Sequence, residues 1–104
     1  MNIEDTLDLT RKIKSDLQEI IKFEKLILIG KFQRLVSSNK ELDFVVVIKD
    51  DTNKFEFVKQ TESLAIQYIS NYKFMFQFFP IHDFDFNSES NAFIRSVQKK
   101  GIEI

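Results

Sequence analysis

Two short apolar runs around a glycine constrain the fold of this chain more than any other feature of its sequence. Residues 26–29 are all Leu or Ile, and Gly30 follows them directly. After eight further residues beyond Arg34, Asp43 opens a second run, residues 44–48, made of Phe, Val and Ile. Apolar runs bounded by turn residues are typical of buried strands. The pattern therefore predicts a strand, a glycine turn, a short helix and a second strand that opens with a carboxylate.

The spacing of apolar residues predicts the helices. Residues 3–21 and 55–69 both carry apolar side chains at helical spacing, so each is expected to form an amphipathic helix. With the two runs above, the expected order begins with helix 3–21, strand 25–29, helical turn 31–37, strand 42–49 and helix 55–69.

The last third of the chain is expected to add a strand and a helix. Residues 72–79 are apolar at most positions, which predicts an interior strand that Pro80 ends or bulges. Ser88 is expected to cap the last helix and Gly101 to end it, before residues 102–104 resume an extended pattern. The apolar stripe of that helix is Phe93, Ile94 and Val97. The predicted order is α-β-α-β-α-β-α, with a short terminal strand.

This order resembles the minimal nucleotidyltransferases of the polymerase-β-like superfamily. Their signature is a hydrophobic run, Gly-Ser, a spacer of about a dozen residues and Asp-hydrophobic-Asp. The matching positions are Gly30, Phe32, Arg34 and Asp43. The departures are Lys31 in place of Ser, Leu35 in place of a second Gly, Leu42 in place of a polar residue and Val45 in place of the second Asp. The last part of the chain fits too, since Phe79-Pro80-Ile81 and residues 91–104 look like the family's tail.

The resemblance implies a fold and a site. The fold is a single α+β domain over residues 1–104, with a mixed sheet of three to four strands and helices packed mainly on one face. The site has Asp43 as the remaining catalytic carboxylate, and Gly30, Lys31 and Arg34 as nucleotide-binding positions. Each has a plainer reading. Gly30 can serve only as a turn, Lys31 can extend into solvent and Arg34 can be a solvated charge. Asp43 can be a strand-edge carboxylate or a helix cap, and this structural reading is favoured for it because it has no partner carboxylate.

The departure at Val45 bears on catalysis. Residues two apart in a strand share a face, so an Asp-hydrophobic-Asp pattern aims two carboxylates at one divalent cation. In this sequence Asp43 shares that face with Val45. Magnesium requires oxygen ligands, so Asp43 alone would hold it weakly. Lys31 retains the backbone amide that meets a phosphate but lacks the hydroxyl of the family's Ser.

A second acidic segment could restore the metal site. Asp83 and Asp85 are expected to alternate with Phe84 and Phe86 along an extended segment. If the third strand keeps its register through Pro80, one of these carboxylates could approach Asp43 and rebuild a metal site. The alternative is a half-buried edge strand, which shows the same alternation. For the single histidine, His82, a hydrogen-bonded or solvent-facing role is favoured over metal ligation.

Composition limits the remaining possibilities. The 15 basic and 16 acidic residues leave no charge excess for duplex nucleic acid or an anionic membrane. Cysteine is absent, which excludes disulfides and thiolate chemistry. No apolar run is long enough for a signal peptide or a membrane span, so a soluble cytoplasmic protein is expected. The 12 phenylalanines are attributed to core packing rather than to base stacking.

Three classes of function follow. The first is a catalytically degenerate nucleotidyltransferase-like domain that acts through a protein partner; the resemblance implies that such a partner can be an RNase toxin to which the domain is the antitoxin. The second is an active enzyme that uses Mg²⁺ and ATP to move AMP from the triphosphate to a hydroxyl group. The third is a structural or oligomerisation module. The loss of the second carboxylate favours the first class, for which no cofactor is expected. The apolar stripe of residues 3–21 is expected to contribute to contacts with a protein partner or a second copy.

Overall fold

The order of helices and strands confirms an α+β fold. The computed structural model describes residues 3–29, 41–73, 75–88 and 91–104. The elements are α1 (Ile3–Ile20), β1 (Lys25–Ile29), β2 (Glu41–Ile48), α2 (Lys54–Tyr72), β3 (Met75–His82), α3 (Asp83–Asn87), α4 (Ala92–Lys100) and β4 (Ile102–Glu103). The strands form one mixed sheet in the order β3-β2-β1-β4, in which β2 and β3 are parallel and the other pairs antiparallel. The helical turn expected at residues 31–37 lies outside the described residues.

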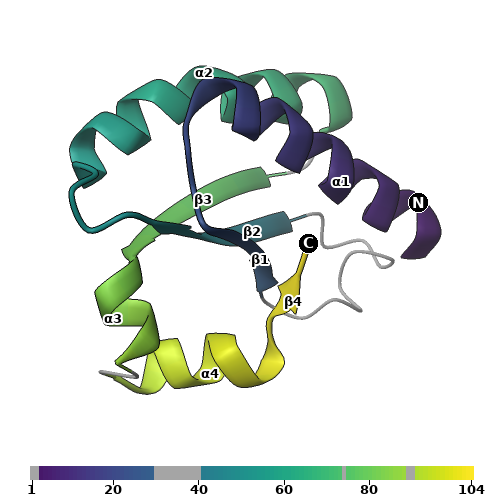
Figure 1. Ribbon diagram of the computed structural model, residues 1–104. Coiled ribbons are helices and arrows are strands. Elements are labelled where there is room, and N and C mark those ends of the chain that lie inside the picture. Colours follow the sequence, from purple (N-terminus) through teal and green to yellow (C-terminus); the bar gives the residue numbers. More distant parts are fainter. Residues whose placement is uncertain (1–2, 30–40, 74, 89–90) are drawn as a thin grey trace.

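Both faces of the sheet are covered by helices (Figure 1). On one face, α1 and α2 pack on Phe44, Val46 and Ile48 of the central strand β2. On the other face, the shorter helices α3 and α4 pack on Val45 and Val47. The five side chains are all fully buried, which explains why this run is apolar at consecutive positions. The two long helices thus lie on one face, as expected, and a second, smaller core covers part of the other.

Helix α1 packs on its own sheet. Ile13 and Leu17 of its apolar stripe are fully buried in the first core. The helix is also tied to α2, because the Tyr68 hydroxyl donates a hydrogen bond to the Asp16 carboxylate. Burial raises the pKa of Tyr68 well above its ordinary value, and the hydrogen bond to Asp16 raises it further. The buried part of the α1 stripe is therefore used inside the domain and is not available to a partner.

Strand β3 differs from its predicted position and role. It runs from Met75 to His82 and lies at the edge of the sheet, whereas the sequence suggested an interior strand over residues 72–79. Pro80 neither ends nor bulges it, since Val46 pairs with Pro80 and Ile48 with His82. Proline is tolerated on an edge strand because its missing N–H can face away from the neighbouring strand.

The segment after β3 is a helix, and the predicted extended conformation is wrong. The Phe84 N–H donates a 2.9 Å hydrogen bond to the Asp50 carboxylate, which therefore satisfies one of the free amides of the first turn. Asp83 and Asp85 lie in that turn, where the helix dipole favours negative charge. Phe86 is buried in the second core, so packing also favours the helix.

Helix α4 begins later than predicted and ends as predicted. Its N-cap is Asn91, whose side chain accepts the Ile94 N–H at 2.9 Å, and not Ser88. Ile94 and Val97 are buried, but Phe93 is 50% exposed. Gly101 follows the last residue, and a Cβ there would lie 2.5 Å from the Val97 carbonyl oxygen. A glycine is required because the chain approaches the helix too closely for any side chain.

Candidate functional site

Asp43 lies near the start of β2, on the face of the sheet that also carries Val45. It is half-buried. In the strand register its neighbours are Ile29 of β1 and Gln77 of β3. The strand positions directly beside Asp43 therefore hold an aliphatic side chain and an amide, and no second carboxylate.

Val45 is part of the second core. Its side chain is 0% exposed. The core around it consists of Ile27, Val47, Ile81, Phe86, Ile94 and Val97. A carboxylate at this position would be surrounded by aliphatic and aromatic groups and would lose its hydration without gaining a polar partner. The local packing is therefore adapted to an apolar side chain where the resembled family has a metal ligand.

The three predicted nucleotide-binding residues lie outside the described residues. Gly30, Lys31 and Arg34 all fall within residues 30–40, so their roles stay predictions.

The structure does not bring Asp83 and Asp85 to Asp43. Register is kept through Pro80, which was the condition for a rebuilt metal site. However, β2 and β3 are parallel, and Asp43 pairs with Gln77 near their beginning, whereas Asp83 follows their end. Asp83 lies six positions after Gln77, which corresponds to about 20 Å along a strand. Strand β3 therefore keeps its register, as the rebuilt site required. Because β3 runs parallel to β2, however, Asp43 and the Asp83 and Asp85 carboxylates lie at opposite ends of the strands.

The acidic segment has local partners. The Asp83 carboxylate accepts a 2.8 Å hydrogen bond from the Asn87 side chain. His82 Nε2 lies 2.8 Å from the carbonyl oxygen of Thr52, as expected for a hydrogen-bonded histidine. Within the part of the chain that the structure describes, no three His, Asp or Glu side chains are grouped to hold a metal ion.

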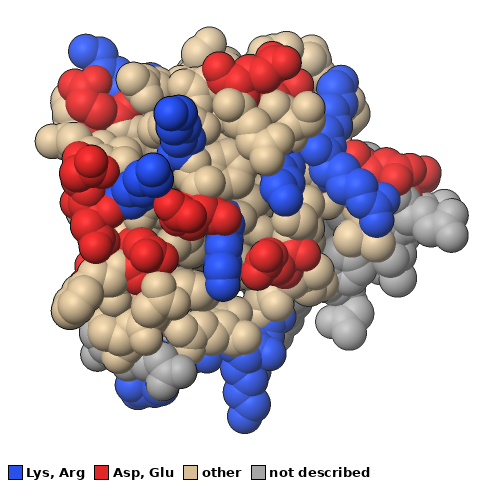
Figure 2. Space-filling model, viewed as in Figure 1, with Lys and Arg blue, Asp and Glu red and all other residues tan. Residues whose placement is uncertain are grey.

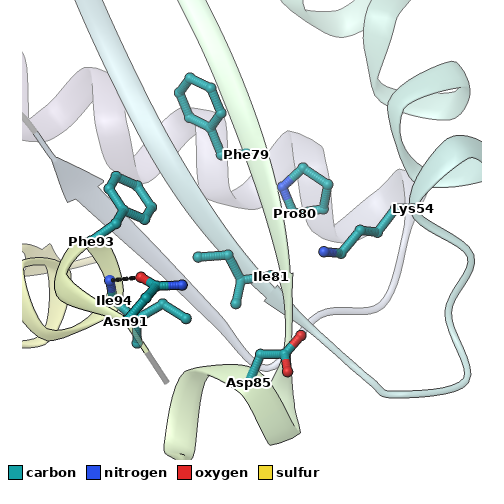
Figure 3. Close-up of a pocket in the computed structure, with 8 residues that line it drawn as sticks. All are labelled: Lys54, Phe79, Pro80, Ile81, Asp85, Asn91, Phe93 and Ile94. Carbon is teal, nitrogen blue, oxygen red and sulfur yellow. Dashed lines mark hydrogen bonds between the residues drawn. The ribbon is translucent and has the colours of Figure 1, made fainter. Parts of the chain in front are cut away.

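A cavity of about 490 Å³ lies on the second face of the sheet, bordered by β3, α3 and α4. Its walls are mostly apolar: Phe79, Pro80, Ile81, Phe93 and Ile94. Figure 3 shows the Phe79 and Phe93 rings on one side and the Lys54 ammonium group on the other, with the Asp85 carboxylate below them. The Asn91 side chain also lines the cavity while it caps α4. This mixture of apolar walls and a few charges suits contact with an apolar side chain or a small amphipathic group.

Several phenylalanines around this region were assigned wrongly to the core. Phe44, Phe57, Phe76 and Phe86 are buried, but Phe55, Phe79, Phe84 and Phe93 are 40–73% exposed. Core packing therefore explains only part of the phenylalanine content. One signal for the exposure of β3 was present in the sequence, because a proline inside an apolar run indicates an edge strand.

The charged side chains form no large field of one sign in the view of Figure 2, where acidic and basic groups lie next to one another. Among the helices that the structure describes, none combines the length and the hydropathy needed to cross a bilayer.

Comparisons of the chain with protein-family models, with curated proteins and with solved structures find no match. The resemblance to the minimal nucleotidyltransferases therefore rests on the sequence motif and on the order of elements, and it stays a prediction.

Proposed function

We propose that this chain is a catalytically degenerate, nucleotidyltransferase-like domain that acts by binding a protein partner. The observation that carries the proposal is the full burial of Val45 in the second core, at the position where the resembled family has its second metal-binding carboxylate. Transfer of a nucleotidyl group depends mainly on stabilisation of charge by a bound metal ion. Asp43 would have to hold that metal ion without help from a carboxylate at residue 45.

Exposed apolar side chains support the binding role. Met75 is 51% exposed, Phe79 40% and Phe93 50%, and the latter two border the cavity. Exposed aromatic residues beside a concave surface are typical of protein-binding sites, where they become anchors that a partner buries. An antitoxin-like role is the form of this function that the sequence resemblance implies.

Titration with magnesium and ATP tests the catalytic half of the proposal. We expect a dissociation constant weaker than about 1 mM, because two oxygen ligands are replaced by one. Isothermal titration calorimetry of the purified chain measures it, with MgCl₂ alone as the blank. Micromolar affinity that requires Mg²⁺ and disappears in Asp43→Asn would contradict the proposal and favour an active enzyme.

A pair of matched variants tests the binding half. We expect Phe93→Asp to reduce recovery of the partner at least about tenfold when the tagged chain is purified from its native host, because a charge would replace an anchor at the cavity. Phe84→Asp is the control, since Phe84 is 70% exposed and does not line the cavity. Quantitative mass spectrometry of the recovered proteins gives the ratio. If both variants recover equally little of the partner, or if both recover as much as the unmodified chain, the surface around Phe93 is not the binding site.

A further inference from the structure

The outer side of α2 exposes large apolar side chains. Phe55, Val58 and Ile66 are 73%, 50% and 57% exposed. The side chains that α2 buries are Phe57, Thr61, Leu64 and Tyr68. Consecutive residues of a helix are rotated by about 100°, so Phe55 and Ile66 lie on the side opposite this buried set. That side of α2 therefore points away from the sheet (Figure 1).

Four residues form a row along this outer side. Steps of four, three and four residues keep them on one side of the helix, which is the spacing of the seam in a coiled coil. We call them the outer row of α2: Phe55, Lys59, Glu62 and Ile66. All four are exposed. The outer row thus has an apolar residue at each end and two opposite charges in the middle.

The outer row is complementary to a second copy of itself. If two copies of α2 lie antiparallel with a two-fold axis at the level between residues 60 and 61, Phe55 of each copy lies level with Ile66 of the other. In the same register Lys59 of each copy lies level with Glu62 of the other. A parallel pair would instead place Lys59 beside Lys59 and Glu62 beside Glu62. The charges therefore select the antiparallel arrangement.

The two flanks of the outer row are compatible with this register. Glu56 is an exposed charge on one flank, and the residue that faces it from the second copy is Ser63. On the other flank Val58 faces the half-buried Ala65 of the second copy, which adds apolar contact. The carboxylate of Glu56 therefore meets a hydroxyl group and not another carboxylate.

Helix α1 lies beside α2 and presents charges of both signs. Its Asp8 carboxylate and Arg11 guanidinium group form an exposed ion pair at 3.0 Å. The other exposed charges of this helix with described side chains are Asp5, Lys12 and Glu19. Two copies can therefore approach through this layer of helices without facing a field of one sign.

We infer that this chain forms a symmetric dimer in which α2 of one copy packs antiparallel on α2 of a second copy through the outer row. Each Phe55–Ile66 contact and each Lys59–Glu62 ion pair occurs twice in the dimer, as two-fold symmetry requires. The contact lies outside the cavity that Phe93 borders, so the inference goes beyond the proposed function and does not depend on it.

The dimer is expected to be weak. Each copy contributes only three exposed apolar side chains, and exposed ion pairs add little affinity. We expect a dissociation constant of about 10–100 μM. At low micromolar concentration such a dimer is dissociated, so unfolding measured there describes the single domain.

A charge-swap experiment tests the register. Lys59→Glu and Glu62→Lys should each raise the dissociation constant at least about fivefold, because each variant opposes like charges twice. An equimolar mixture of the two should restore dimer formation, since one copy then carries two carboxylates and the other two ammonium groups. The double variant should also restore it, because its ion pairs are only reversed. Sedimentation equilibrium measures all four samples, with Glu19→Lys on α1 as the matched control.

A crosslink gives a second, independent readout. The sequence has no cysteine, so Phe55→Cys and Ile66→Cys each introduce a single thiol. In the inferred register residue 55 of one copy meets residue 66 of the other. Two copies of residue 55 lie eleven residues apart along the helix axis, which is about 16 Å and beyond the reach of a disulfide. We expect mild oxidation to crosslink a mixture of the two variants and to leave each variant alone mostly monomeric.

Several results would overturn the inference. They are an unmodified chain that is still monomeric at about 500 μM, a dimer that tolerates both single charge variants, or a double variant and a mixture that stay as weak as the single variants although all fold. Crosslinking of Phe55→Cys alone, as efficient as that of the mixture, would exclude the register. None of these results bears on the proposed function, which the magnesium–ATP titration and the Phe93 variant decide separately.

Discussion

Val45→Asp is expected to lower the free energy of unfolding by about 3–5 kcal/mol. Val45 is fully buried among aliphatic and aromatic side chains of the second core, so a carboxylate would lose its hydration and gain no cation. Natural domains of this size are stable by only about 5–15 kcal/mol, so a large fraction of the stability would be removed. Urea unfolding followed by circular dichroism measures the change.

The matched control for this variant is Val58→Asp, the same substitution on α2. Val58 is 50% exposed, so the cost should stay below about 1 kcal/mol. A Val45→Asp protein as stable as the control would mean that water or an ion reaches residue 45. That result would contradict the burial on which the degenerate-site proposal depends and would revive the metal-dependent enzyme.

Phe44→Ala is expected to cost about 3–5 kcal/mol, because it removes a fully buried ring from the first core and leaves a cavity. The Phe44 ring stacks on Phe78 of β3, with centroids 5.7 Å apart, so the parallel β2–β3 pair should be weakened as well. Thermal and urea unfolding provide the measurement.

Phe84→Ala is the matched control for Phe44→Ala, since its ring is 70% exposed on α3. We expect a loss below about 1 kcal/mol. The contrast separates the structural phenylalanines from the exposed ones. If both variants cost the same, the division into buried and exposed phenylalanines would be wrong.

The candidate site was only partly predictable from the sequence. The absence of a carboxylate at residue 45 is visible in the sequence, and so is the expectation that Val45 shares a face with Asp43. The failure of Asp83 and Asp85 to reach Asp43 was not visible, because it depends on β2 and β3 being parallel. The hydrophobic pattern of a strand does not encode the direction of its neighbour.

The conformation of the last third of the chain was also only partly predictable from the sequence. Residues 83–86 alternate Asp and Phe, which fits an extended segment, yet they form α3 because Asp50 accepts the Phe84 N–H and Phe86 inserts into the second core. Asp50 lies more than thirty residues earlier in the chain, so no local window contains this interaction. The cavity beside Phe79 and Phe93 could not be predicted from a local stretch of sequence either, because its walls come from β3, α3 and α4.

Local chemistry determined α1, β1 and β2, because amphipathic periodicity and unbroken apolar runs depend only on nearby residues. It also determined the end of α4, where Gly101 is required by a close approach of the chain to Val97. The edge position of β3 had one signal in the sequence, Pro80. Only the tertiary structure decided that Phe93 is exposed and that the acidic segment lies far from Asp43. These properties depend on which strands and helices become neighbours, and the free energy that selects neighbours is the burial of surface summed over the whole domain.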